Sequence, residues 1–122
     1  MSSLEDFMAM QKNDRYPVRG PPPVTVHTIA LENGPVTGIR VKMGKAPLLL
    51  LAAPGGYVMC GYLNMDTANR LGDLAALVTG VSDFDQMLDA PLAAVSHPGQ
   101  GIGKPGMTAR EFLNRLLEES HG

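Results

Sequence analysis

The stretch that decides the fold runs from Pro47 to Asp66 and reads PLLLLAAPGGYVMCGYLNMD. Its first part, Leu48–Ala53, is continuously apolar, which is typical of a central strand that is covered on both faces. A helix is the competing interpretation, because leucine and alanine are good helix formers. Pro47 and Pro54 leave too few residues between them for a comfortable helix, and so the sequence predicts a strand.

The second half of the stretch predicts a turn, another strand and the start of a helix. Pro54–Gly56 is a turn signal, and Tyr57–Gly61 is typical of a short strand. Asn64 or Asp66 can cap a helix that we expect to run to Val78, because apolar residues keep helical spacing there. Gly72 is the weak point of that helix.

A hairpin is expected before this stretch. Val24–Leu31 and Val36–Met43 both alternate between two faces and are rich in β-branched residues, which favours strands. Asn33-Gly34 between them is the strongest short hairpin signal, although Pro35 favours a slightly longer turn. The sequence therefore predicts two antiparallel strands with one solvated face.

Shorter elements are expected after the stretch. Thr79–Val81 is expected to be extended, and a helix capped by Ser82 should end before Pro91. Leu92–Ser96 is a candidate strand, and Thr108–Glu111 forms a capping box for a last helix. The predicted fold is therefore α+β, an antiparallel-rich mixed sheet of about five to six strands packed with three short helices.

Length, charge and composition indicate one cytoplasmic domain. A chain of 122 residues can bury one core, which we assign to residues 24–122, with the Pro-rich residues 1–23 as a flexible N-terminal segment. A formal net charge of −2, without a run of Lys or Arg, disfavours nucleic-acid and membrane partners. The single cysteine, the acidic N-terminus and the short apolar run predict a cytoplasmic location.

Three segments give the chain a family resemblance. They are GYVMCGYL (Gly56–Leu63), LVTGVSDFDQMLDAPLAAV (Leu77–Val95) and GMTAREFLNRL (Gly106–Leu116). With the strands ahead of them, these segments resemble the YunC-like family over roughly residues 34–117, so that the Pro-rich N-terminal segment lies outside the likeness. The resemblance implies a compact α/β domain, and it carries no assigned reaction.

Cys60 is the first candidate for chemistry, because it lies at the C-terminal end of a predicted strand, just ahead of a predicted helix. Backbone N–H groups and the positive end of a helix dipole would favour the nucleophilic thiolate at such a junction. Gly61 would let a substrate approach closely, and His97 could act as a base if the fold brings it near. A free cysteine is also among the most buried residue types, so a structural role stays open.

The loop Gly101–Gly106, GIGKPG, is the second candidate. It matches GxGxxG formally, and its N–H groups could hold an anion next to Lys104. The dinucleotide motif needs an acid about 20 residues later, and the phosphate loop needs Ser or Thr where Pro105 stands, so a plain turn is the main alternative. The candidate ligand-binding residues are thus Gly61, Asn64, Gly101, Gly103 and Lys104.

Metal and cofactor sites are not expected. Asp83, Asp85 and Asp89 lie on or beside one short helix. Acids at its first turn are explained by their favourable interaction with the positive end of the helix dipole. No His or Cys accompanies them to complete a set of metal ligands.

Three functions are compatible with the sequence. The favoured one is a small ligand-binding or regulatory domain that takes a small anionic ligand and forms a homo-oligomer, because the strand Leu48–Ala53 needs cover on both faces. The second is a small enzyme that uses Cys60 as nucleophile or redox thiol, with His97 as base. The third is an interaction module that docks through its N-terminal arm.

Overall fold

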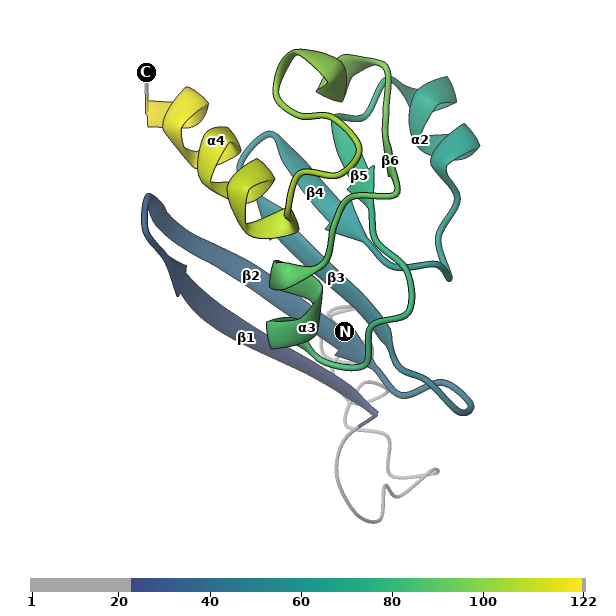
Figure 1. The fold of residues 1–122 in the computed structure, drawn as a ribbon. Coiled ribbons are helices and arrows are strands. Elements are labelled where there is room, and N and C mark those ends of the chain that lie inside the picture. The colour runs from purple at the N-terminus through teal and green to yellow at the C-terminus, as the bar shows by residue number, and fades with distance from the viewer. Residues whose placement is uncertain (1–22, 122) are drawn as a thin grey trace, which may run out of the picture.

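Strands that follow one another in the chain are neighbours in a single sheet (Figure 1). The computed structural model describes residues 23–121. The strands of this part are β1 (Val24–Leu31), β2 (Gly34–Val41), β3 (Leu48–Ala53), β4 (Gly56–Met59), β5 (Ala75–Leu77) and β6 (Ala94–Val95). Its helices are α2 (Met65–Leu71), α3 (Phe84–Asp89) and α4 (Ala109–His121), with a 3-10 turn η1 (Pro98–Gly101). All neighbouring strands are antiparallel except β4 and β5. The predicted α+β fold with an antiparallel-rich mixed sheet is therefore confirmed.

The predicted hairpin is confirmed, with its turn one residue earlier than expected. Leu31 pairs with Gly34, so the turn residues are Glu32 and Asn33, and β2 begins at Gly34. Gly34 has a φ of 143°, which a side chain would disfavour. The backbone N–H of Asn33 donates to Oδ1 of Asn114 at 2.9 Å, which ties the turn to α4.

The leucine-rich strand is central, as its uniform apolarity predicts. β3 lies between β2 and β4. Leu49 and Leu51 are fully buried in the main core, while Leu50 packs against a smaller cluster on the opposite face. Since successive side chains of a strand point to opposite faces, an apolar residue is required at each of these positions.

The helix predicted over residues 64–78 is wrong in its second half. α2 ends at Leu71, because Gly72 takes a left-handed φ of 77° and its N–H donates to the carbonyl groups of Ala68 and Asn69. The following Ala75–Leu77 is β5, parallel to β4, so the extended piece predicted at Thr79–Val81 lies four residues earlier. Alanine and leucine fit a buried strand as well as a helix; Gly72 ends the helix before them, and pairing with β4 makes them a strand.

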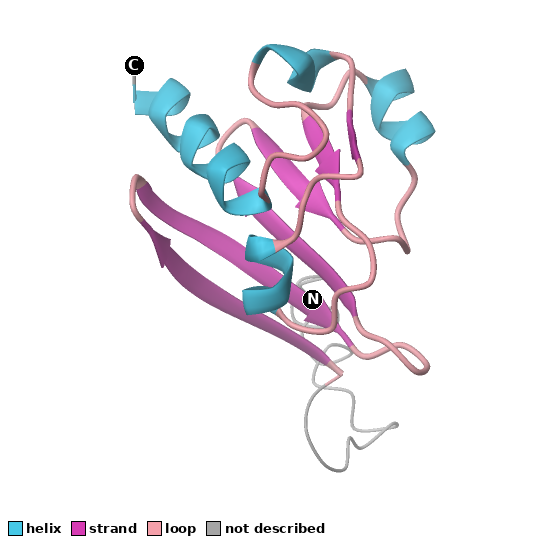
Figure 2. Ribbon diagram, in the orientation of Figure 1, coloured by secondary structure: helices cyan, strands magenta, loops and turns pink. Residues whose placement is uncertain are grey.

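The two faces of the sheet are covered unequally (Figure 2). α3 and α4 pack over one face, where Phe112 and Leu113 of α4 are fully buried in the main core. α2 packs on the opposite face, where its Ala68 meets Met59 and Ala75 of β4 and β5. The opposite face of β1 and β2 lies outside both core clusters.

The caps of α3 and α4 follow the predicted chemistry closely. Asp83, one residue after the predicted Ser82, caps α3 by accepting from the N–H of Gln86. The capping box at α4 is confirmed, since the N–H of Glu111 donates to Oγ1 of Thr108 at 3.2 Å. None of the described helices is long and apolar enough to cross a membrane. The predictions made for residues 1–22 lie outside the described residues.

Candidate functional site

A cavity of about 350 Å³ opens at the carboxyl ends of the two parallel strands. β4 leads directly into Cys60 on one wall, and β5 leads through Val78 and Thr79 to the opposite wall. The lining residues are Ala46, Pro47, Cys60, Gly61, Tyr62, Gly80, Val81 and Ser82. In open α/β sheets, ligands bind outside the carboxyl ends of the parallel strands, and the cavity occupies the equivalent position beside this one parallel pair of the described sheet.

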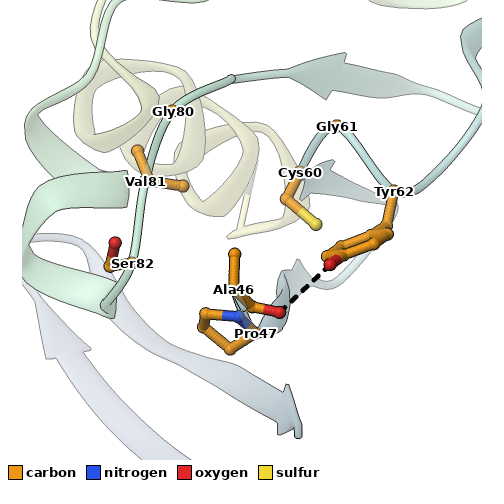
Figure 3. A pocket seen from close by; sticks show the side chains of 8 residues that line it. All are labelled: Ala46, Pro47, Cys60, Gly61, Tyr62, Gly80, Val81 and Ser82. Carbon is orange, nitrogen blue, oxygen red and sulfur yellow. Dashed lines mark hydrogen bonds between the residues drawn. The ribbon is translucent and has the colours of Figure 1, made fainter. Parts of the chain in front are cut away.

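Cys60 lies just below the surface of this cavity. Its residue is 4% exposed, and its sulfur points into the space between Ala46 and Tyr62 (Figure 3). The backbone N–H of Leu49 on β3 donates to Sγ of Cys60 at 3.3 Å. The central strand thereby fixes the orientation of the side chain. Cys60 directly follows β4 and precedes α2, so the strand ends one residue before the cysteine and the predicted strand-to-helix junction is present.

The remaining walls are uncharged. The hydroxyl of Tyr62 donates to the carbonyl oxygen of Ala46 at 3.2 Å and joins the loop after β4 to the turn before β3. On the opposite wall Gly80 adopts a left-handed φ of 71°, and Val81 and Ser82 follow it. No lining residue in this described part of the chain is a histidine, a carboxylate or an amine. The cavity is therefore suited to a small ligand with an apolar portion.

His97 lies at the other end of β5. Ser96, the residue before it, accepts from the N–H of Ala75 through its Oγ, at the start of that strand. The N–H of Val78, just after the strand, donates to the carbonyl of Met59, beside Cys60. Three residues of strand separate these points by about 10 Å. The structure therefore does not bring His97 and Cys60 together as base and nucleophile.

The glycine loop is occupied by its own hydrogen bonds. The N–H groups of Ile102 and Gly103 donate to Gly99, and that of Gly106 donates to Leu92. A Cβ on Gly103 would lie 2.6 Å from the ring of Phe112, so this glycine is required for packing. These N–H groups are therefore already engaged with backbone carbonyl groups, and Gly101 and Lys104 stay exposed beside them.

Asn64 has a structural role as the cap of α2. Its Oδ1 accepts from the N–H groups of Asp66 and Thr67 at 2.7 and 3.2 Å. In the described part of the chain, no group of three or more His, Cys, Asp or Glu residues is placed to hold a metal ion.

A tyrosine–aspartate pair is a feature that sequence reasoning missed. The hydroxyl of Tyr57 donates to Oδ2 of Asp73 at 2.7 Å, beneath α2. Burial raises the pKa of Tyr57 to about 12, and the hydrogen bond to the Asp73 carboxylate and its negative charge act in the same direction. The residues are sixteen apart, and no sequence signal links them.

A group of basic residues was also missed. Arg40, Lys42 and Lys45 line a hollow of about 300 Å³ at the turn between β2 and β3. The sequence carries no run of basic residues, and the turn brings these three together. Arg40 lies in β2 and Lys42 directly follows its last residue, and this spacing of two indicates a shared side, whereas nothing in the sequence places Lys45 beside them.

Comparison with known proteins gives relatives of unknown function. Residues 59–116 match the family model described as "Domain of unknown function (DUF1805)". The "Uncharacterized protein YunC" of Bacillus subtilis (strain 168) is 35% identical over 100 residues, which cover 78% of this chain and 99% of the relative. The crystal structure of "a Protein of Unknown Function TA1206 from Thermoplasma acidophilum" matches with a TM-score of 0.72 and 36% identity, over 76% of this chain and 92% of that one.

Proposed function

The chain belongs to the YunC-like family of domains of unknown function, and we propose that it binds a small molecule in the Cys60 cavity. The observation that supports this proposal is the position of the cavity at the carboxyl ends of β4 and β5, the one parallel pair of the described sheet. Loops that follow parallel strands leave a crevice there, and small-molecule sites of α/β proteins use it repeatedly.

Binding fits the cavity better than catalysis by Cys60. A cysteine nucleophile commonly works with a neighbouring base that takes up its proton. The cavity lining holds no histidine and no carboxylate among the described residues, and His97 lies at the other end of β5. The alternative of a small enzyme or redox thiol would therefore rest on Cys60 alone.

A blocking variant tests the cavity directly. A Cβ on Gly61 would meet its nearest neighbour, Cγ2 of Thr79, at 3.9 Å, so a Cβ fits there without a clash. Gly61→Leu should therefore fold and fill the mouth of the cavity. The measurement is the alkylation of Cys60 by iodoacetamide in the native protein, followed by mass spectrometry. We expect Gly61→Leu to slow this reaction by an order of magnitude.

Gly101→Leu is the matched control, because a Cβ there meets no atom within 4 Å and the position lies in the glycine loop. It should react like the original protein. Equal rates in all three chains would show that the reagent does not reach Cys60 through this cavity, and the proposal would fail.

Self-association is a second proposed property, and a sheet face that residues 23–121 leave uncovered supports it. Cross-strand partners share a face, so Val24 with Val41 and Val26 with Ile39 form an apolar surface on β1 and β2. Val24 and Val26 are 49% and 65% exposed. Apolar sheet faces of this kind are buried by packing against a second layer, and a second copy of the chain would supply one.

Light scattering over a wide range of protein concentration tests this second proposal. We expect a mass above that of one chain, and Val26→Glu should return it to one chain because a charge would be buried in the interface. Ala93→Glu adds the same charge to an exposed loop residue and should leave the mass unchanged. A single-chain mass at every concentration would remove self-association.

A further inference from the structure

A basic hollow adjoins the Cys60 cavity. It has a volume of about 300 Å³ and is lined by Arg40, Lys42, Met43, Gly44, Lys45, Ala46 and Pro47. The last two residues also line the Cys60 cavity, so the two spaces share a wall. The carbonyl oxygen of Ala46 accepts a hydrogen bond from the hydroxyl of Tyr62, which fixes the wall shared by the two spaces.

The local fold gathers the positive charge of this hollow. Arg40 lies in β2 and Lys42 directly follows its last residue, and alternate side chains along an extended chain share one side. The backbone N–H of Lys42 donates to the carbonyl of Pro23, which extends the pairing of β1 with β2 by one step. The following turn then returns Lys45 to the same hollow.

These three cations have no acidic partner in residues 23–121. The ion pair found in this part of the chain joins Arg110 to Asp89, on α4 and α3. All three basic residues are exposed. Like charges gathered without counter-charges repel one another, and a bound anion would relieve that repulsion.

We propose that the basic hollow binds the anionic group, a carboxylate or a phosphate, of the small molecule whose apolar portion occupies the Cys60 cavity. The inference rests on the proposed binding function and adds the chemical class of the ligand. Arg40, Lys42 and Lys45 supply the charge, and guanidinium and ammonium groups are the usual partners of both anions.

A nucleic acid fits this hollow less well than a small anion. Nucleic-acid binding uses an extended basic face that neutralises several phosphates in a row. The chain has a formal net charge of −2, with ten Lys and Arg against twelve Asp and Glu. Three cations around one small hollow match a single anionic group.

The glycine loop is the competing anion site, and its surroundings are less favourable. The hollow beside it is lined by Gly101, Ile102, Arg115, Glu118 and Glu119, so two carboxylates face one guanidinium. Arg115 already donates to the carbonyl of Ile102 at 3.0 Å. Lys104 of this loop therefore serves as the control cation.

Two alkylating reagents of similar size separate the two proposals. Iodoacetamide is neutral and iodoacetate is anionic, and both form a carbon–sulfur bond with the Cys60 thiolate while iodide leaves. The neutral reagent reports whether the cavity reaches Cys60. The ratio of the iodoacetate rate to the iodoacetamide rate, divided by the same ratio for the urea-unfolded chain, reports whether the native site attracts an anion.

We expect this normalised ratio to exceed one and to fall as cations are removed. Arg40→Gln, Lys42→Gln and Lys45→Gln should each lower it by about twofold, since a unit charge roughly 8 Å away in water contributes about RT. The triple variant should lower it about fivefold or more, and added salt should have the same effect. Lys104→Gln should leave the ratio unchanged.

Several results would overturn the inference. A ratio that stays the same in the triple variant would show that the basic hollow does not bind the anion. A ratio that falls with Lys104→Gln would assign the anion to the glycine loop instead. Failure of iodoacetamide to react with the native chain removes the cavity itself and is a failure of the proposed function.

Competition then identifies the anionic group. Inorganic phosphate and acetate are compared as inhibitors of the iodoacetate reaction, with sodium chloride at equal ionic strength as the control. Stronger inhibition by phosphate assigns a phosphate ligand, and stronger inhibition by acetate assigns a carboxylate. Inhibition by neither, beyond the effect of chloride, would overturn the inference.

Discussion

The backbone N–H of Leu49 donates a hydrogen bond of 3.3 Å to Sγ of Cys60, so the central strand β3 holds the sulfur at the end of β4. The candidate site is thus built onto the most buried part of the sheet, where Leu49 is fully buried. A side chain fixed in this way is held in place before any ligand binds, and its removal should lower the stability of the fold.

Cys60→Ala tests this contact. The variant removes a side chain from the main core and leaves the N–H of Leu49 without its sulfur acceptor. We expect the free energy of unfolding, measured with urea, to fall by about 1–3 kcal/mol. A change within about 0.5 kcal/mol would show that neither the packing nor the hydrogen bond of Cys60 matters to stability.

Gly103→Ala tests the packing role of the glycine loop. The added Cβ would lie 2.6 Å from Phe112, which is fully buried. Overpacking of this kind should cost about 1–3 kcal/mol in thermal or urea unfolding. Gly101→Ala is the control, because its Cβ meets nothing within 4 Å, and it should be nearly neutral. Equal stability of the two variants would contradict this account of the loop.

Gly72→Ala tests what ends α2. The φ of 77° at Gly72 is strained for a side chain, although no neighbouring atom lies within 4 Å. We expect a loss of about 1 kcal/mol in the free energy of unfolding. Gly44→Ala, also in open space and without a positive φ, should cost less. The helix end would need another explanation if Gly72→Ala were as stable as Gly44→Ala.

Tyr57 predicts a loss of stability at high pH. Its pKa is raised from 10.0 to about 12 in the folded chain, so folding favours the protonated phenol. The contribution of protonated Tyr57 to the free energy of unfolding is complete below pH 10 and is lost as the pH rises through about 12. The free energy of unfolding, measured with urea across this pH range, should decline more steeply in the original chain than in Tyr57→Phe. Parallel pH profiles would contradict the Tyr57–Asp73 pairing.

Much of the fold could be predicted from local pattern. The alternation in β1 and β2, the uniform apolarity of β3 and the capping box of α4 each have one main physical interpretation, and the structure contains all of them. Residues 75–77 do not have one main interpretation, because alanine and leucine suit a helix and a buried strand alike. Their placement depends on pairing with β4, a contact that sequence spacing does not encode.

The candidate site could be predicted only in part. The position of Cys60 at a strand end followed from neighbouring residues, whereas the opposite wall depends on the parallel pairing of β4 with β5. His97 could not be placed, because its position depends on β6 and on the bond of its N–H to Asn69. Arg40, Lys42 and Lys45 were missed because a turn, and not a run of sequence, gathers them.

The urea dependence of Cys60 alkylation by iodoacetamide tests the central claim most directly. If the reagent enters through the cavity, the native chain should react at a rate that hardly changes with low urea, because little surface is exposed by the reaction. If Cys60 is closed in the core, the rate should rise with urea as steeply as global unfolding does. The first result is the one this account predicts, and the second would contradict it.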